Sequence, residues 1–109
     1  MLPIETDSRT VHADRQAGAD LLLVDCREPD EWAIVKIEGA KLMPMSELAE
    51  RLGELEPYRD RRIVVHCHHG GRSLRVANWL RGQGFQNAQS MAGGIDAWAA
   101  EIDPSLVRY

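Results

Sequence analysis

The sequence has no apolar run long enough to cross a bilayer, and its first ten residues, MLPIETDSRT, show neither a basic start nor an apolar core. We therefore expect neither a transmembrane segment nor a secretory signal peptide. Cysteine is scarce: Cys26 and Cys67 stand far apart, and no Cys-x-x-Cys pair is present. We expect a cytoplasmic protein without a structural disulfide, because thiols stay reduced there. The sequence is still compatible with a chemically reactive cysteine.

An excess of basic residues is also missing. The chain carries 13 lysines and arginines against 17 aspartates and glutamates, which gives a formal net charge of −4. This balance argues against a general nucleic-acid binder and against a protein that associates with anionic membranes. With 109 residues, of which 44% are hydrophobic and 28% charged, the chain suits one compact domain over residues 1–109.

Strand and helix patterns alternate along the chain. Strands are expected near residues 4–5, 21–24, 39–44, 63–65 and 88–91. Helices are expected over residues 7–18, from 28, from 46, over 72–81 and over 94–100. This alternation predicts an α/β fold with a small parallel sheet and helices on both of its faces. In the helix that begins at Ser46, Leu48, Leu52 and Leu55 fall on one stripe.

The stretch HCHHGGRS, from His66 to Ser73, places a cysteine between a predicted strand and a predicted helix. In an open parallel sheet, ligands bind at the carboxyl ends of the strands, where Cys67 stands. The adjacent glycines allow a tight loop with inward-pointing N–H groups, which stabilises an anion together with the start of the helix. A cysteine there has a lowered pKa and reacts as a thiolate. The alternative is a glycine-rich turn around an inert, buried cysteine.

Two other chemistries compete for this stretch. A zinc site would use Cys67 and the neighbouring histidines, but adjacent residues on one tight loop cannot easily supply a tetrahedral set, and His12 is the only other histidine. We therefore expect no metal. A cysteine-dependent phosphatase closes its loop with an arginine in the pattern C-x5-R, whereas Arg72 gives C-x4-R here. The shorter loop has fewer N–H donors and suits an anion centred on sulfur better than a phosphoryl group.

Four separated segments carry recognisable motifs, at residues 24–32, 37–40, 64–73 and 92–98. They resemble D-x-R-E-x-x-E-[YFW], G-H-I-x-G-A, C-x-x-G-x-R-S and A-G-G-x-x-x-W of the rhodanese-like sulfurtransferases, in their single-domain form. Each motif alone is weak, but four in the right order are specific, and together they cover nearly the whole chain.

The resemblance implies a rhodanese-like three-layer α/β/α fold with a five-stranded parallel sheet. It also implies that Cys67 attacks a small anionic sulfur donor, thiosulfate or a persulfide, and carries the sulfur as a persulfide. The acceptor would be cyanide or a small-molecule or protein thiol, and no cofactor, nucleic acid or membrane is implied. The anion-binding loop would comprise His68, His69, Gly70, Gly71, Arg72 and Ser73.

The sequence allows more than one role for several side chains around this loop. His68 and His69 are candidates for donor binding, and Arg72 either contacts the donor or points outward from the start of its helix. Asp25 and Arg27 follow the second strand at the same sheet edge, and we interpret them as a structural ion pair that supports the floor of the site.

The chain departs from the family pattern at two places. Val35-Lys36-Ile37 stand where the family has G-H-I, and Lys36 adds positive charge if it faces the site. Cys26 stands where the family commonly has an apolar residue, which we interpret as a packing substitution. The alternative is that Cys26 resolves the persulfide as an internal thiol.

Two further functions compete with sulfur transfer. A non-catalytic rhodanese-like binding module commonly loses its nucleophile, whereas this chain keeps Cys67 and the glycine loop. A phosphatase or arsenate reductase is disfavoured by the C-x4-R spacing.

Overall fold

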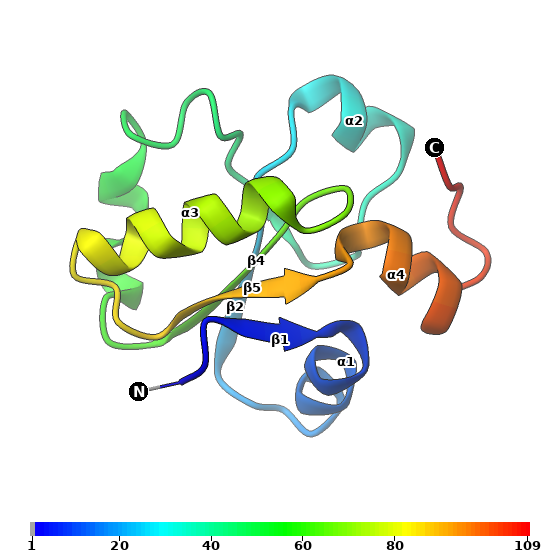
Figure 1. Ribbon diagram of the computed structural model, residues 1–109, viewed down its shortest axis with the longest axis horizontal. Coiled ribbons are helices and arrows are strands. Elements are labelled where there is room, and N and C mark those ends of the chain that lie inside the picture. The colour runs from blue at the N-terminus through cyan, green and yellow to red at the C-terminus, as the bar shows by residue number, and fades with distance from the viewer. Residues whose placement is uncertain (1) are drawn as a thin grey trace.

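The computed structural model describes residues 2–109, in which strands and helices alternate along the chain (Figure 1). The strands are β1 (Glu5–Asp7), β2 (Leu21–Asp25), β3 (Lys41–Leu42), β4 (Arg62–His66) and β5 (Ala88–Ala92). The helices are α1 (Ser8–Gln16), α2 (Pro29–Ile34), α3 (Gly71–Gly82) and α4 (Gly94–Glu101), and a 3₁₀ helix, η1 (Leu52–Tyr58), precedes β4. Within the described residues, no helix is long and apolar enough to cross a membrane.

All five strands run parallel in one sheet, in the spatial order β1-β5-β4-β2-β3. β4 lies in the middle, between β2 and β5, and its residues Ile63, Val64 and Val65 are fully buried. A continuous apolar strand of this kind is typical of a sheet that is covered on both faces. The predicted three-layer α/β fold with a small parallel sheet is confirmed.

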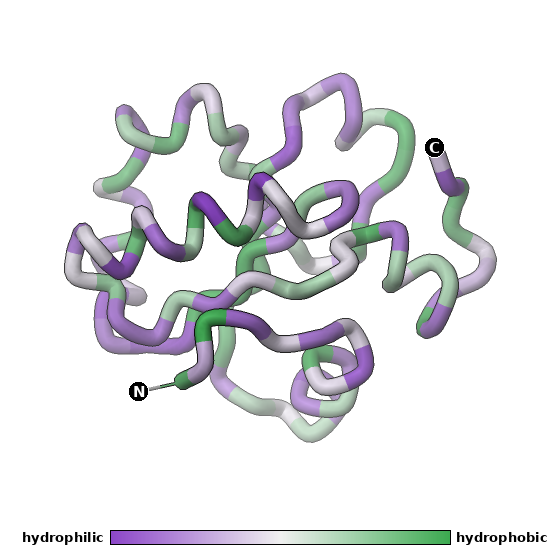
Figure 2. Tube along the Cα trace, viewed as in Figure 1, coloured by the Kyte–Doolittle hydropathy of each residue, from purple (hydrophilic) through white to green (hydrophobic). Residues whose placement is uncertain are grey.

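Each face of the sheet has its own apolar core. Under α3, Leu80 packs in one cluster with Val65 of β4. On the opposite face, Val11 of α1 and Trp98 of α4 pack in a second cluster with Val64. Val64 and Val65 serve different clusters because successive side chains of a strand point to opposite faces. Figure 1 shows α3 and α1 on opposite sides of the sheet, and Figure 2 shows polar and apolar residues alternating along α3.

The prediction of a regular helix from Ser46 is wrong. Residues 45–51 form turns, and the 3₁₀ helix η1 follows them, with backbone bonds that span three residues. Pro57 lies inside η1 and lacks an N–H, and Gly53 is a poor helix former, so both disfavour a longer α-helix. Leu55 is nevertheless fully buried, because the short helix still turns its apolar side toward the core.

The start of α4 holds the backbone of the loop that follows β4. The Ile95 N–H donates to the Cys67 carbonyl at 2.8 Å, and the Asp96 N–H donates to the His68 carbonyl at 3.1 Å. Gly94 lies against both carbonyls with a φ of +58°. A Cβ there would overlap the Cys67 carbonyl oxygen and stand 2.5 Å from that of His68. The second glycine of the A-G-G motif is therefore a requirement of close backbone contact.

We predict that Gly94→Ala lowers the free energy of unfolding by about 2 kcal/mol or more, because alanine resists a positive φ and its Cβ would displace the loop. Urea unfolding measures the change. Gly53→Ala is the control, because Gly53 is exposed, its φ is not positive and nothing lies within 4 Å of its Cβ position. Its effect should stay within about 0.5 kcal/mol. Equal stability of the two variants would contradict this account of Gly94.

Candidate active site

Cys67 directly follows the central strand β4, and its side chain is 1% exposed. The Gly70 N–H donates to the Cys67 sulfur at 3.1 Å, and the Ser73 N–H donates to it at 3.4 Å. Gly70 makes this loop possible, because its φ is +112° and a Cβ there would stand only 3.1 Å from the Gly93 nitrogen. The sulfur thus lies between the end of β4 and the positive end of α3.

A pair of buried serines adds to this environment. The Ser73 hydroxyl lies 3.5 Å from the Cys67 sulfur and 2.7 Å from the Ser90 hydroxyl. Both serines are fully buried. The sequence did not point to Ser90, because it carries no motif. Only the pairing of β5 with β4, in which Ser90 is the register partner of Val65, brings it to the site.

These contacts change the acidity of both cysteines. Hydrogen bonding by the Cys26 side chain, with smaller contributions from the Ser73 hydroxyl and the N–H groups of Ser73 and Gly70, lowers the pKa of Cys67 to about 4, although burial opposes the change. Hydrogen bonding with Cys67, together with burial, raises the pKa of Cys26 well above its usual range. At neutral pH, these shifts favour a thiolate at Cys67 and a protonated thiol at Cys26.

Arg72 pairs with a carboxylate that the sequence analysis did not consider. Its Nη1 and Nη2 atoms donate to the two carboxylate oxygens of Glu31 at 2.7 and 2.9 Å, so the guanidinium links the start of α3 to α2. The hydrogen bond from Arg72 lowers the pKa of Glu31 to about 2. Glu31 was part of the D-x-R-E-x-x-E-[YFW] motif, but the motif alone assigned it no role.

Asp25 and Arg27 form the ion pair that the sequence suggested, and both side chains are fully buried. Arg27 Nε donates to Asp25 Oδ1 at 3.0 Å, and Arg27 Nη2 donates to Oδ2 at 2.7 Å. The same Nη2 donates to the Val35 carbonyl at 2.6 Å, which ties β2 to the loop after α2. His66 Nε2 lies 3.8 Å from Asp25, and burial lowers the pKa of His66, so this imidazole is neutral at pH 7.

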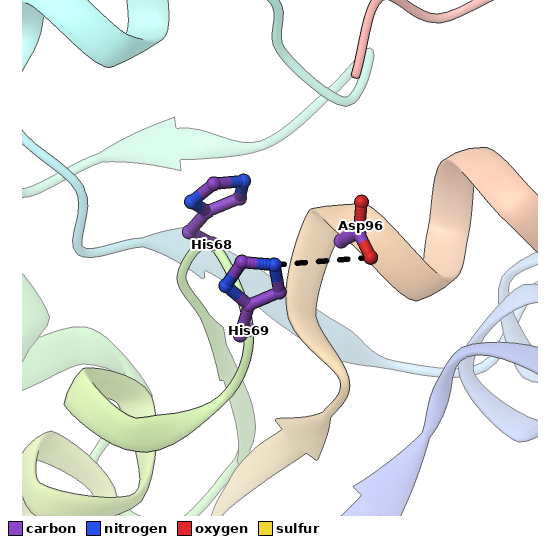
Figure 3. Close-up of side chains that lie close together, drawn as sticks. All are labelled: His68, His69 and Asp96. Carbon is purple, nitrogen blue, oxygen red and sulfur yellow. Dashed lines mark ion pairs between the residues drawn. The ribbon is translucent and has the colours of Figure 1, made fainter. Parts of the chain in front are cut away.

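His68 and His69 gather with Asp96 of α4 at the rim of the loop (Figure 3). The two rings stack at 3.9 Å, and His69 Nε2 lies 3.8 Å from Asp96 Oδ2. One nitrogen or oxygen atom of each residue lies within 4.8 Å of the others, a set that can hold a divalent metal ion. The sequence argument against a metal considered the loop alone and missed Asp96. In this structure the Asp96 carboxylate accepts hydrogen bonds from Nε and Nη2 of Arg108, and a metal ion would have to displace this guanidinium.

The end of the chain covers the same rim. The Tyr109 ring stacks on His68 with 3.8 Å between centroids and 5° between planes. Its hydroxyl donates to Glu31 at 2.8 Å and accepts from Arg27 Nη1 at 2.8 Å. The sequence assigned no task to this segment, and no local pattern marks it, since every one of these contacts joins residues far apart in the chain.

Lys36 lies away from the loop. Its ammonium group stands 5.0 Å from the centroid of the Trp32 ring, in cation–π geometry. It also lines a cavity of about 670 Å³ with His12, Arg15 and Trp98, and no residue from 67 to 73 lines that cavity. Lys36 therefore does not add positive charge at Cys67.

We predict that Asp25→Asn lowers the free energy of unfolding by about 3–5 kcal/mol, because it leaves the buried Arg27 guanidinium without its countercharge. Chemical unfolding followed by circular dichroism measures this loss. Asp20→Asn is the matched control: Asp20 pairs with Arg61 at 3.6 Å, but its side chain is 73% exposed. That variant should change stability by less than about 1 kcal/mol. A small effect at both positions would show that the buried pair does not hold this region together.

Comparison with known proteins places these features in a family. The model described as "Rhodanese-like domain" matches residues 8–101. A sulfurtransferase of Allochromatium vinosum is 36% identical over 95 residues, a match that covers 87% of this chain and 87% of that protein. The thiosulfate sulfurtransferase GlpE of Pseudoalteromonas translucida is 32% identical over 89 residues. This match covers 82% of this chain and 83% of that protein.

Other relatives are longer, and solved structures share the fold. Two longer relatives are 38% and 39% identical in the matched region, and this chain spans only 30% and 24% of their lengths. The crystal structure of a rhodanese-related protein from Thermoplasma volcanium superposes with a TM-score of 0.82 at 30% identity, covering 98% of this chain and all of that one. A strand-end cysteine in a glycine loop, the four motifs and these matches agree: the chain belongs to the rhodanese-like domain family, among whose members are sulfurtransferases.

Proposed function

We propose that this protein transfers sulfane sulfur through a persulfide on Cys67. The observation that carries the proposal is the position of the Cys67 sulfur, which is buried at the end of the central strand and accepts N–H groups of Gly70 and Ser73. Such donors stabilise negative charge on a thiolate and on the terminal sulfur of a persulfide alike. The relatives named as sulfurtransferases, which match over most of their length, support the same reaction.

In the first half-reaction, the Cys67 thiolate attacks the outer sulfur of an anionic donor such as thiosulfate. The bond between the two donor sulfurs breaks, and sulfite leaves with its electron pair. Cys67 then carries one additional sulfur as Cys–S–S⁻. The reaction needs a thiolate at neutral pH, and the lowered pKa of Cys67 supplies one without an external base.

In the second half-reaction, an acceptor attacks the terminal sulfur and takes it away, which restores the Cys67 thiolate as the leaving group. Cyanide would leave as thiocyanate, and a small-molecule or protein thiol would leave as a persulfide. The N–H groups of Gly70 and Ser73 donate to the Cys67 sulfur, and in the loaded state the N–H groups of the same loop would stabilise the terminal sulfur.

The charged groups around Cys67 bear on how a small anionic donor would bind. Both nearby arginines are already paired, Arg27 with Asp25 and Arg72 with Glu31, which limits the net positive charge at the loop. We propose that the histidine pair at the rim meets the donor through His69, whose side chain is 65% exposed, whereas the His68 ring stacks on His69 and Tyr109. The paired arginines keep the loop and α2 in position.

The competing functions fit less well. Phosphoryl transfer needs an arginine that is free to bind the equatorial oxygens, whereas both terminal nitrogens of Arg72 are bonded to Glu31. A module that only binds a partner has no need for a thiol with a pKa far below its usual range. Both observations favour sulfur transfer.

The direct test is to incubate the protein with thiosulfate and measure its mass. We predict a gain of one sulfur atom on Cys67, release of sulfite, and formation of thiocyanate when cyanide is added. Cys67→Ser should lower thiocyanate formation by about a thousandfold or more, because an alcohol is not ionised at neutral pH and carries no persulfide. Its circular dichroism should match that of the native protein. Absence of both mass gain and thiocyanate would refute the proposal, and phosphoester hydrolysis would favour a phosphatase instead.

We also predict how the thiolate depends on pH. With a pKa of about 4, Cys67 stays ionised throughout the neutral range and becomes protonated only as the pH falls through that value. The ultraviolet absorbance of the thiolate, with Cys67→Ser as the blank, follows this titration. Cys26→Val removes the first cause of the low pKa, so the midpoint should move to higher pH. An unchanged midpoint would mean that the Cys26 thiol does not stabilise the thiolate.

A further inference from the structure

Cys26 and Cys67 lie at the carboxyl ends of two neighbouring parallel strands. β2 and β4 pair in register up to Asp25 and His66, and the Cys26 N–H continues the ladder by donating to the His66 carbonyl at 3.0 Å. The next two residues in register are the two cysteines. Neighbouring strands lie about 4.8 Å apart, which falls within the range of about 4.4–6.8 Å between the Cα atoms that disulfides join, so the register places the two cysteines within reach of each other.

The two side chains also share one face of the sheet. Val24 and Val65 are register partners two residues earlier, and all four side chains belong to the apolar cluster under α3. Cys26 is fully buried, and Cys67 is 1% exposed. Both cysteines therefore lie in one buried space, where Cys26 neighbours the inner sulfur of any persulfide that forms on Cys67.

We propose that Cys26 is a resolving thiol, which releases the sulfur carried by Cys67 as sulfide and leaves a Cys26–Cys67 disulfide. This activity rests on the proposed persulfide of Cys67. The Cys26 sulfur attacks the inner sulfur of Cys67–S–S⁻, a new bond forms between the two cysteine sulfurs, and the bond to the terminal sulfur breaks. The terminal sulfur leaves with the electron pair and takes the Cys26 proton as HS⁻. Both cysteines are oxidised, the sulfane sulfur is reduced to sulfide, and no external oxidant is consumed.

The charge at the site makes this step available only after sulfur loading. In the unloaded protein, the neighbouring Cys67 thiolate and burial raise the pKa of Cys26 and keep it protonated. Loading makes the inner sulfur neutral and moves the negative charge one atom further out. That removes the charge that held the Cys26 proton and creates an electrophilic sulfur next to it. A dithiol reductant would then reopen the disulfide and complete a cycle that yields sulfide.

The alternative is that Cys26 only fills space. Valine is nearly the same size, apolar and unable to form a disulfide, so Cys26→Val preserves the packing and removes the chemistry. Cys26→Ser serves as a second variant, which keeps a hydrogen-bond donor beside Cys67 but supplies no sulfur. The two variants separate the effect on the Cys67 pKa from the resolving reaction.

The experiment is a single loading of the full chain with thiosulfate, without oxygen and without external thiol. Sulfite, sulfide and the intact mass are followed together, and peptide mapping locates the modification. We expect one equivalent of sulfite, then up to one equivalent of sulfide, and a protein lighter than the reduced form by two hydrogens, with Cys26 joined to Cys67. Both variants should release sulfite, keep the additional sulfur on Cys67 and yield no sulfide. The native protein without thiosulfate should keep both thiols.

Each other outcome overturns a defined part of the scheme. Sulfite release with a stable persulfide on the native Cys67 refutes the resolving role and leaves the sulfurtransferase function intact. Additional sulfur found on Cys26 also refutes it, because attack has then occurred at the terminal sulfur. Absence of sulfite from the native protein and both variants refutes the persulfide itself, and with it both proposals.

Discussion

Negative charge on a buried sulfur dictates how the loop after β4 and the helices next to it are arranged. Cys67 is almost fully buried, and a charge there is unfavourable unless donors surround it. The N–H groups of Gly70 and Ser73 supply them, and the loop can aim them inward because its carbonyls are bonded elsewhere. The start of α4 takes up two of these carbonyls, through Ile95 and Asp96. The helices on the two faces of the sheet thus act on one loop, α3 on its donors and α4 on its acceptors.

Dipoles and a thiol, more than full positive charges, stabilise the thiolate. Arg27 and Arg72 both form ion pairs with carboxylates, so neither brings an unpaired positive charge to the sulfur. An unpaired arginine would bind small anions near the loop tightly, whereas N–H dipoles are short-ranged and stabilise charge mainly at the sulfur itself. The paired arginines join α2, β2 and α3 around the loop, which fixes the position of its N–H groups.

The rim of the site brings together the loop after β4, the helices α2 and α4, and the end of the chain. Tyr109 connects His68, Glu31 and Arg27, and Arg108 holds Asp96, so the end of the chain lies against the loop that carries the nucleophile. This layer of stacked rings and paired charges lies beside Cys67. Its groups come from segments that are far apart in sequence and have no motif in common.

The fold class, and the position of Cys67 in a glycine loop at a strand end, could be predicted from the amino-acid sequence alone. Those features rest on local chemistry: apolar runs for buried strands, glycines for a positive φ, and a cysteine at a strand-to-helix junction. The sequence did not determine the form of the segment after Pro44, where Gly53 and Pro57 outweigh an apolar stripe. Only the tertiary structure decided the partners of Arg72, the arrival of Ser90 and Asp96, and the pairing of Cys26 with Cys67. Those contacts follow from strand order and register, which bring distant residues together and leave no local pattern behind.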